Sequence, residues 1–415
     1  MSSQRILSNL RRAPFARATL SAGFAALLAF AFFHTGAARS QSAPSLQERF
    51  RKMSIDAETK GLAQPFVGIT AHGTPESGLF EIRSTGVSTE PVRKAAARFL
   101  EMLTAEQRAK TVYPVDDPEW RKWMNQHFYI RQGVSFLEMS EPQREAAIGL
   151  LRAGLSAKGL KLTRDIMKLN HTLGELNNND FEQYGEWRYH ITVMGQPSTK
   201  EPWGWQLDGH HAIINYFVLG DQVVMTPYFA GSEPVIAKSG KYKGTVILQD
   251  EQNRGLALIS ALPEPLRNKA VLQVSKTGNN NLTEAFKDNV VLDYAGAPVK
   301  DMSQAQRKQV VDLIRLYVDN MDDGHARVKM DEVTRHLDNT WFAWIGETKP
   351  DSVFYYRIHS PVILIEFDHQ RPAGLRHLLP DTPNREHVHV VVRTPNGNDY
   401  GKDLLRMHYQ LHPHT

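Results

Sequence analysis

The segment from His387 to Arg393 constrains the fold more than any other part of the chain. It reads His-Val-His-Val-Val-Val-Arg, and a β-strand places successive side chains on opposite faces. One face is purely apolar and consists of Val388, Val390 and Val392. The other face carries His387, His389, Val391 and Arg393. We therefore predict a strand that packs its valines in a core and presents two convergent imidazoles, as metal ligands or as a proton-transfer pair.

Histidines are concentrated around this strand. Eight of the 17 histidines lie between His359 and His414, so we expect the functional site in the C-terminal segment. A solvent-facing edge strand with a polar half would show the same alternation, and this second interpretation stays open at the level of sequence.

The run from Val362 to Asp368 is a second predicted strand. Period two places Glu366 and Asp368 on one face and three apolar residues on the other. If this strand neighbours the histidine strand, two carboxylates face two imidazoles, which suits a divalent ion or a general acid/base couple. The alternative is a strand that runs out into solvent, where acidic residues are common.

A further pair of histidines follows Gly209. On a strand, His211 shares a face with Asn215, whereas His210 shares the other face with apolar residues. We assign His210 to the core and His211 to the site. Two tryptophans just upstream, Trp203 and Trp205, lie on one strand face; with Asn215 they are candidates for substrate binding, or the tryptophans are ordinary core residues.

The last candidate lies near the C-terminus, where a turn at Asn396-Gly397 leads into a predicted helix from Asp403 to His412. Asp399 or Asp403 would cap this helix. His408 lies one helical turn after Leu404, so it is expected to point back to the sheet and to supply another imidazole.

The first 38 residues are predicted to be an export signal. Four arginines precede an apolar run from Leu20 to Phe33, and small residues close it at Ala38. The alternative is an uncleaved anchor, but the apolar run is short for a span of about 20 residues. We expect a periplasmic or secreted protein without a stable membrane anchor after cleavage.

Charge and cysteine content exclude several classes of protein. The formal net charge is +4, and removing the five arginines of residues 1–40 leaves −1 for the rest, so nothing indicates a nucleic-acid partner. The chain has no cysteine, which excludes disulfides, zinc–cysteine sites and thiol nucleophiles. Any metal ion must therefore be held by His, Asp, Glu or backbone oxygen.

The pattern of elements predicts one α+β domain over residues 39–415, with helices packed around a mixed, mostly antiparallel sheet. We expect helices up to about residue 180, strands over 186–230, helices over 246–345 and strands over 353–415. Capping boxes at Ser140 and Ser303 mark two helix starts, and Gly220-Asp221 is typical of a hairpin turn. The motifs of serine hydrolases, P-loops, dinucleotide-binding folds and His-Glu-x-x-His metalloproteases are absent from the sequence.

Several short motifs together resemble a family of exported bacterial and fungal proteins catalogued as a domain of unknown function, number thirty-five hundred. They are Trp203-Gly204-Trp205, Gly209-His210-His211, Pro227 to Pro234, Tyr356-Arg357-Ile358, Ile365 to Asp368, His387-Val388-His389, Arg393, Tyr400-Gly401, Asp403 to Leu405 and His408-Tyr409. The resemblance implies export and one family-wide domain, and it supplies no activity.

These observations lead to a metal-dependent enzyme, hydrolytic or oxidative, as the first hypothesis. The predicted ligands of a divalent metal ion are His211, His387, His389 and His408. The predicted catalytic residues are Glu366, Asp368 and Arg393, with Arg393 holding an oxygen of a small-molecule or polymer-derived substrate. Two alternatives remain: an exported ligand-binding protein without turnover, and a metal-free His/carboxylate acid–base enzyme.

Overall fold

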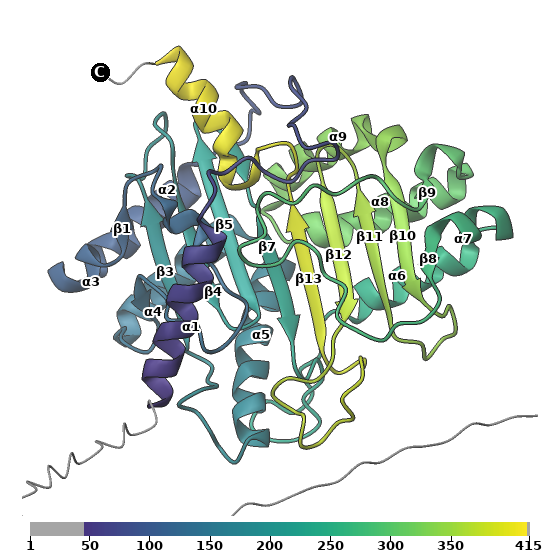
Figure 1. Ribbon diagram of the computed structural model, residues 1–415. Helices are drawn as coiled ribbons and strands as arrows, with labels where there is room; N and C mark the ends of the chain where they lie inside the picture. Colours follow the sequence, from purple (N-terminus) through teal and green to yellow (C-terminus); the bar gives the residue numbers. More distant parts are fainter. Residues whose placement is uncertain (1–44, 413–415) are drawn as a thin grey trace, which may run out of the picture. The chain divides into compact units, whose positions relative to one another are not determined.

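A mixed sheet of 13 strands organises residues 45–412, the part of the chain that the computed structural model describes (Figure 1). Its main path is β1-β3-β4-β5-β7-β13-β12-β11-β10-β8, and all neighbours on that path are antiparallel except β1–β3 and β10–β8. The predicted α+β class with a mostly antiparallel sheet in a single domain is confirmed. The predicted signal, residues 1–38, lies outside the described residues.

The strands on the N-terminal side of the sheet are β1 (Val112–Tyr113), β2 (Val134–Ser135), β3 (Tyr189–Met194), β4 (Trp203–Gly209), β5 (Ala212–Leu219), β6 (Gln222–Val224) and β7 (Tyr228–Ser232). The remaining strands are β8 (Val271–Gln273), β9 (Ala297–Pro298), β10 (Trp341–Gly346), β11 (Phe354–His359), β12 (Leu364–His369) and β13 (Val388–Arg393). The expected turn at Gly220-Asp221 joins β5 to β6.

The helices are α1 (Leu46–Gly61), α2 (Glu90–Met102), α3 (Ala105–Ala109), α4 (Glu141–Gly154), α5 (Ala157–Leu176), α6 (Gln249–Ala261), α7 (Glu264–Ala270), α8 (Gln304–Val318), α9 (Asp323–Arg335) and α10 (Lys402–Leu411). Short 3-10 turns are η1 (Pro118–Arg121), η2 (Val299–Asp301), η3 (Leu337–Asn339) and η4 (Asp399–Gly401). Both predicted capping boxes are present, at the starts of α4 and α8. No helix among the described residues has the length and apolar character needed to cross a membrane.

The two faces of the sheet are covered in different ways. The three valines Val388, Val390 and Val392 belong to the large core shared with α2, α4, α5, α6, α8 and α9. Val391 belongs to a smaller core on the other face, with Trp123, Phe229 and Tyr400. That second face lies under α1, α10 and long irregular segments, in front of the sheet in Figure 1.

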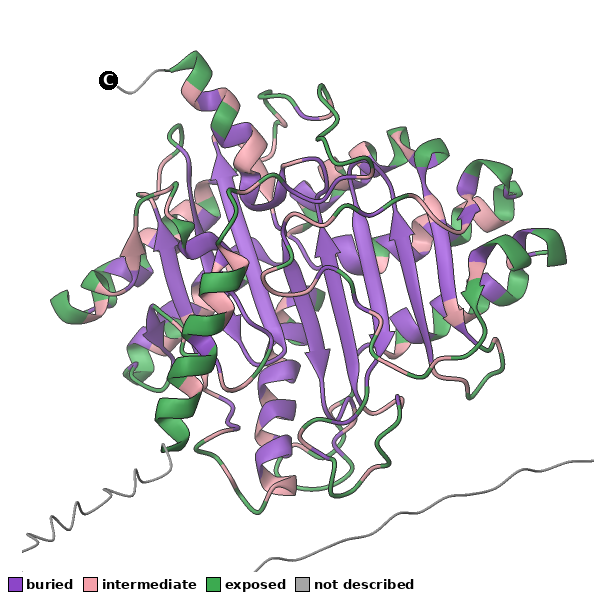
Figure 2. Cartoon of the chain, in the orientation of Figure 1, coloured by how far each residue is buried: buried purple, intermediate pink, exposed green. Residues whose placement is uncertain are grey.

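Both candidate strands therefore lie inside the protein. β13 is central, between β7 and β12, and every residue of β12 and β13 is buried (Figure 2). The condition set for the carboxylate strand is met: it pairs with the histidine strand, and Asp368 lies opposite His389. A solvent-facing edge strand and an acidic strand end in solvent are both excluded.

Residues 246–345, expected to be helical, contain α6 to α9, but residues 274–296 form no helix. This segment contains the polar run Ser275 to Asn281, which offers no apolar stripe to bury as a helix. It is irregular apart from a single bridge between Val291 and Thr70, and it crosses the second face of the sheet. Its backbone N–H groups bind the buried carboxylates of β12 instead of forming a helical ladder.

The buried carboxyl of Glu119 in η1 leads to a pH-dependent prediction. Burial raises the pKa of Glu119 to about 8, although the ammonium of Lys122 lies 3.7 Å away. The folded pKa exceeds the unfolded value of about 4.3, so the native state holds a proton that the unfolded chain has released. This group's contribution to stability therefore falls as the pH rises from about 4.5 to 8.

Replacing Glu119 by glutamine removes this titration. We expect the variant to gain about 1–3 kcal/mol in free energy of unfolding over the wild type at pH 8, and little at pH 4.5. Urea unfolding at the two pH values measures the difference. An equal effect of the substitution at both values would contradict the account.

Candidate metal centre

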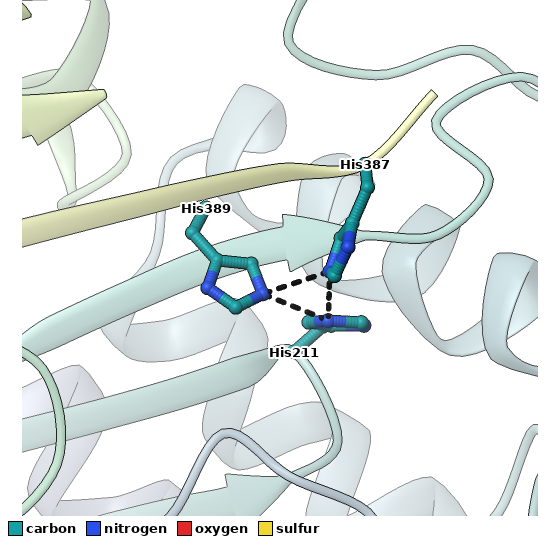
Figure 3. Close-up of side chains that lie close together, drawn as sticks. All are labelled: His211, His387 and His389. Carbon is teal, nitrogen blue, oxygen red and sulfur yellow. Dashed lines mark hydrogen bonds between the residues drawn. The ribbon is translucent and has the colours of Figure 1, made fainter. Parts of the chain in front are cut away.

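Three imidazoles meet at one point on the second face of the sheet. The Nε2 atoms of His211, His387 and His389 form a triangle with sides of 3.2 Å (His211–His389), 3.3 Å (His211–His387) and 3.0 Å (His387–His389). Figure 3 shows the rings of His387 and His389, from one strand segment, converging with the ring of His211 from another part of the chain. All three residues are buried, and among the described residues they are the group able to hold a metal ion.

Sheet pairing brings these distant segments together. His387 precedes β13, and His389 lies within it opposite Gly231 of β7. His211 occupies the two-residue turn between β4 and β5, with a left-handed φ of +64°. Its backbone is fixed on both sides, because its N–H donates to the Asn125 carbonyl and its carbonyl accepts from the Gly231 N–H. A non-glycine residue held at positive φ is a conformation typical of functional sites.

Gly231 is required for the close approach of β7 to the histidine strand. A Cβ at this position would lie 2.5 Å from the Val388 carbonyl oxygen and 3.3 Å from Cδ2 of His389. The absence of a side chain therefore gives the His389 ring the space that it occupies beside His211.

The neighbours of the rings determine which nitrogen carries the proton. Nδ1 of His387 lies 2.6 Å from the Arg371 carbonyl oxygen, and Nδ1 of His389 lies 2.7 Å from Oε1 of Glu284. Both partners are acceptors, so both Nδ1 atoms donate, and in the neutral rings each Nε2 presents its lone pair to the centre. Two lone pairs 3.0 Å apart repel unless a cation lies between them.

The triangle has the dimensions of a metal-binding face. Zinc–imidazole distances of about 2.0–2.1 Å in a tetrahedral site imply nitrogen–nitrogen separations of about 3.3 Å. Three protein ligands leave a fourth position open for water or substrate, which is the arrangement of catalytic rather than structural zinc sites.

The electrostatic surroundings favour neutral imidazoles and a bound cation. Burial, reinforced by the neighbouring imidazoles, lowers the pKa of His211 and of His389 well below the usual 6.5. Two carboxylates flank the centre: Glu284, and Glu233 at 3.7 Å from Nδ1 of His387. Burial also raises the pKa of Glu284, so its charged form gains from a nearby positive ion.

Glu284 is thus predicted to orient His389 and to raise its basicity toward a metal ion. Glu284→Gln keeps an acceptor oxygen but removes the charge, and we expect metal affinity to fall about 10–100-fold. Competition with a chromogenic chelator measures the affinity. The matched control is Glu145→Gln on the exposed surface of α4. Equal metal affinity in the two variants would mean that Glu284 does not support metal binding.

Glu366 and Asp368 lie beside the histidines and hold the irregular segment over them. Glu366 accepts hydrogen bonds from the backbone of Leu282, from the backbone and hydroxyl of Thr283, and from the Tyr355 hydroxyl. Asp368 pairs with the buried ammonium of Lys276 at 2.9 Å, and burial raises its pKa. Their contacts position the loop that carries Glu284, whereas the catalytic roles predicted for them remain predictions.

Arg393 is fully engaged within the protein. Its guanidinium donates to Asp399 and to Asp288, both at 2.7 Å, and to the Thr283 carbonyl oxygen at 3.0 Å. The residue has no exposed surface. The structure therefore does not present Arg393 to a substrate oxygen, because its charge is used by two buried carboxylates.

His408 is not brought to the cluster. It lies on α10, and its Nε2 is 3.6 Å from the carboxylate of Glu201, just before β4 begins. His211 follows the other end of β4, a strand of seven residues and so roughly 20 Å long. The helix at 402–411 is confirmed, but it packs at the opposite end of the sheet from His211.

The candidate substrate-binding residues also lie away from the three histidines. Trp203 and Trp205 are fully buried in the core on the helical face, and Trp205 stacks on Tyr216. The Asn215 amide binds Gln206 and the Pro227 carbonyl inside the sheet. These contacts agree with the alternative that the tryptophans are core residues.

His210 is buried and hydrogen-bonded, as expected, but it lies in the turn between β4 and β5 and not on a strand. Its ring stacks on His211 at 4.0 Å, and its Nδ1 lies 2.8 Å from the Asn170 side-chain oxygen.

The two flanking glutamates, Glu233 and Glu284, were not predicted from the sequence. Both lie in segments without periodicity, so no pattern pointed to them.

Fold and site together define an α+β protein with a buried three-histidine centre capable of holding a metal ion. The model of the family described as "Protein of unknown function (DUF3500)" matches residues 85–402, and the chain belongs to this family. The matched range includes all three histidines and both flanking glutamates. No curated protein and no solved structure matches the chain.

Proposed function

We propose that this protein is an exported metal-dependent enzyme that uses His211, His387 and His389 to bind one divalent ion and hydrolyse a small or polymer-derived substrate. The observation that carries the proposal is the triangle of Nε2 atoms at 3.0–3.3 Å, with the opposite nitrogens of His387 and His389 bound to acceptors. Such a set of imidazoles suits zinc, copper, nickel or iron.

The charge of the ligand set supports hydrolysis as the proposed reaction. Three neutral imidazoles would leave the full positive charge on a bound ion, which would lower the pKa of a coordinated water toward neutrality. The Glu284 side chain is 21 % exposed, so the centre lies near solvent on that side. Copper or iron in the same ligands would support oxidative chemistry instead, and the identity of the bound metal separates the two reactions.

The position of the tryptophans favours this reading over a binding protein without turnover. That alternative relied on a cleft walled by Trp203 and Trp205, and both side chains are fully buried in a core. Export is supported by the basic and apolar leader of residues 1–38.

An ester substrate tests the activity. The purified protein, loaded with zinc, is assayed with 4-nitrophenyl acetate before and after a chelator, beside His387→Ala/His389→Ala. We expect hydrolysis that stops with the chelator, returns with zinc and is absent from the double variant. Hydrolysis that persists in chelator would favour the metal-free acid–base alternative and overturn the proposal.

A further inference from the structure

A second site lies in a cleft beside the start of α10, separate from the three histidines. The cleft has a volume of about 790 Å³, which is in the range of small-molecule sites. Its apolar wall is formed by Phe66, Val67, Phe80 and Met407. Lys402, the first residue of α10, and Asp116 also line it.

Lys402 is an unusual lysine for its position. Its side chain is half-buried, and its ammonium forms no hydrogen bond or ion pair with another described residue. Other lysines that are mostly buried here are paired, as Lys276 is with Asp368. Lys402 also stands at the positive end of the α10 dipole, which disfavours a cation.

We propose that Lys402 is an amine nucleophile that forms an imine with small aldehydes or ketones bound in this cleft, and that Asp116 transfers the protons. The lysine nitrogen adds to the carbonyl carbon to form a carbinolamine. The C–O bond then breaks, the oxygen leaves as water with both former amine protons, and a C=N bond forms. Hydrolysis reverses the step, so no oxidant or reductant is needed.

Burial makes the amine of Lys402 partly neutral near physiological pH, although most of the charges around it favour the protonated form. The charged groups that act on the amine or line the cleft with it are Glu76, Asp116, Asp117, Arg121, Asp288, Asp403 and Arg406. Arg121 is committed to Asp288, and Arg406 to Asp403. Burial is the main cause that lowers the pKa of Lys402 to about 8, and a free amine is the form that attacks a carbonyl.

Reductive trapping tests the proposal. The purified protein is treated with benzaldehyde and sodium cyanoborohydride at pH 7.5, and peptide mass spectrometry follows each lysine with time. We expect Lys402 to be alkylated at least about ten-fold faster than the exposed Lys94 and Lys308, with half-maximal rate near pH 8. Alkylation of Lys402 at the rate of these reference lysines would overturn the proposal.

Two variants separate the roles in the cleft. Lys402→Arg keeps the positive charge but removes the amine. In this variant no lysine should be alkylated faster than the reference lysines, and the circular dichroism spectrum should match that of the wild type. Asp116→Asn should slow imine formation but leave acetylation of Lys402 by acetic anhydride unchanged, because acetylation needs no loss of water. Equal changes in both reactions, or no change in either, would overturn the proton-transfer role of Asp116. Chelator should have no effect, since the cleft contains none of the three histidines.

Discussion

Replacing Arg393 by alanine is expected to lower the free energy of unfolding by about 3–5 kcal/mol. Both Asp288 and Asp399 lie 2.7 Å from the guanidinium in the wild type. The substitution leaves the buried Asp399 without its cation, whereas Asp288 keeps only Arg121, also at 2.7 Å. Breaking a buried pair on one side costs far more than the pair itself contributes, because the remaining charges are uncompensated. Urea denaturation at pH 7 measures the loss.

A surface pair provides the control for this experiment. Arg307 binds Asp338 at 2.6 Å, but the Asp338 side chain is 70 % exposed. Arg307→Ala is therefore expected to cost no more than about 1 kcal/mol. If Arg393→Ala were as stable as Arg307→Ala and lost only activity, the arginine would have the substrate-binding role predicted from the sequence instead of a structural one.

Zinc is expected to stabilise the wild-type protein by about 4 kcal/mol at a free concentration of about 1,000 times its dissociation constant. The ion binds the folded state, because the unfolded chain does not bring the three histidines together. His211 lies 176 residues before His387 and 178 residues before His389 in the sequence. In His211→Ala/His387→Ala/His389→Ala this stabilisation should disappear. Thermal unfolding with and without zinc measures both proteins.

A matched variant guards against nonspecific effects of zinc. His171 lies on α5 beside Glu175, at 3.7 Å, and outside the three-histidine group. His171→Ala should keep the full stabilisation by zinc. Equal stabilisation of the wild type and the triple variant would mean that zinc acts at other histidines, and the proposed centre would be wrong.

The strand faces could be predicted from the sequence because period two leaves little freedom. Val388, Val390 and Val392 of β13 pack in the core on the helical face of the sheet, and His389 lies on the opposite face, as the alternation requires. The pairing of β12 with β13 could only be assumed from the sequence, although each strand shows one apolar and one polar face. His211 was chosen on the assumption of a strand register, but it lies in the turn between β4 and β5. The sheet order explains how it meets residues far along the chain.

The surroundings of the centre could not be predicted because they come from irregular segments. Glu284 lies in an irregular segment that the buried Glu366 holds in place. Glu233 directly follows β7 and itself holds the loop at 373–375. Arg393 shares a face with the histidines, but sequence alone does not reveal that Asp288 and Asp399 bind it. His408 lies one helical turn after Leu404, which indicated that it faces the sheet. The sequence does not reveal that its helix packs at the end of β4 away from His211.

The metal content of the purified protein tests the central claim most directly. After incubation with zinc, copper, manganese and iron in turn, followed by gel filtration, mass spectrometry counts metal atoms per chain. The three-histidine centre predicts close to one atom per chain in the wild type and close to none in His387→Ala/His389→Ala. No bound metal in the wild type under any of these conditions, or equal metal in both proteins, would contradict it.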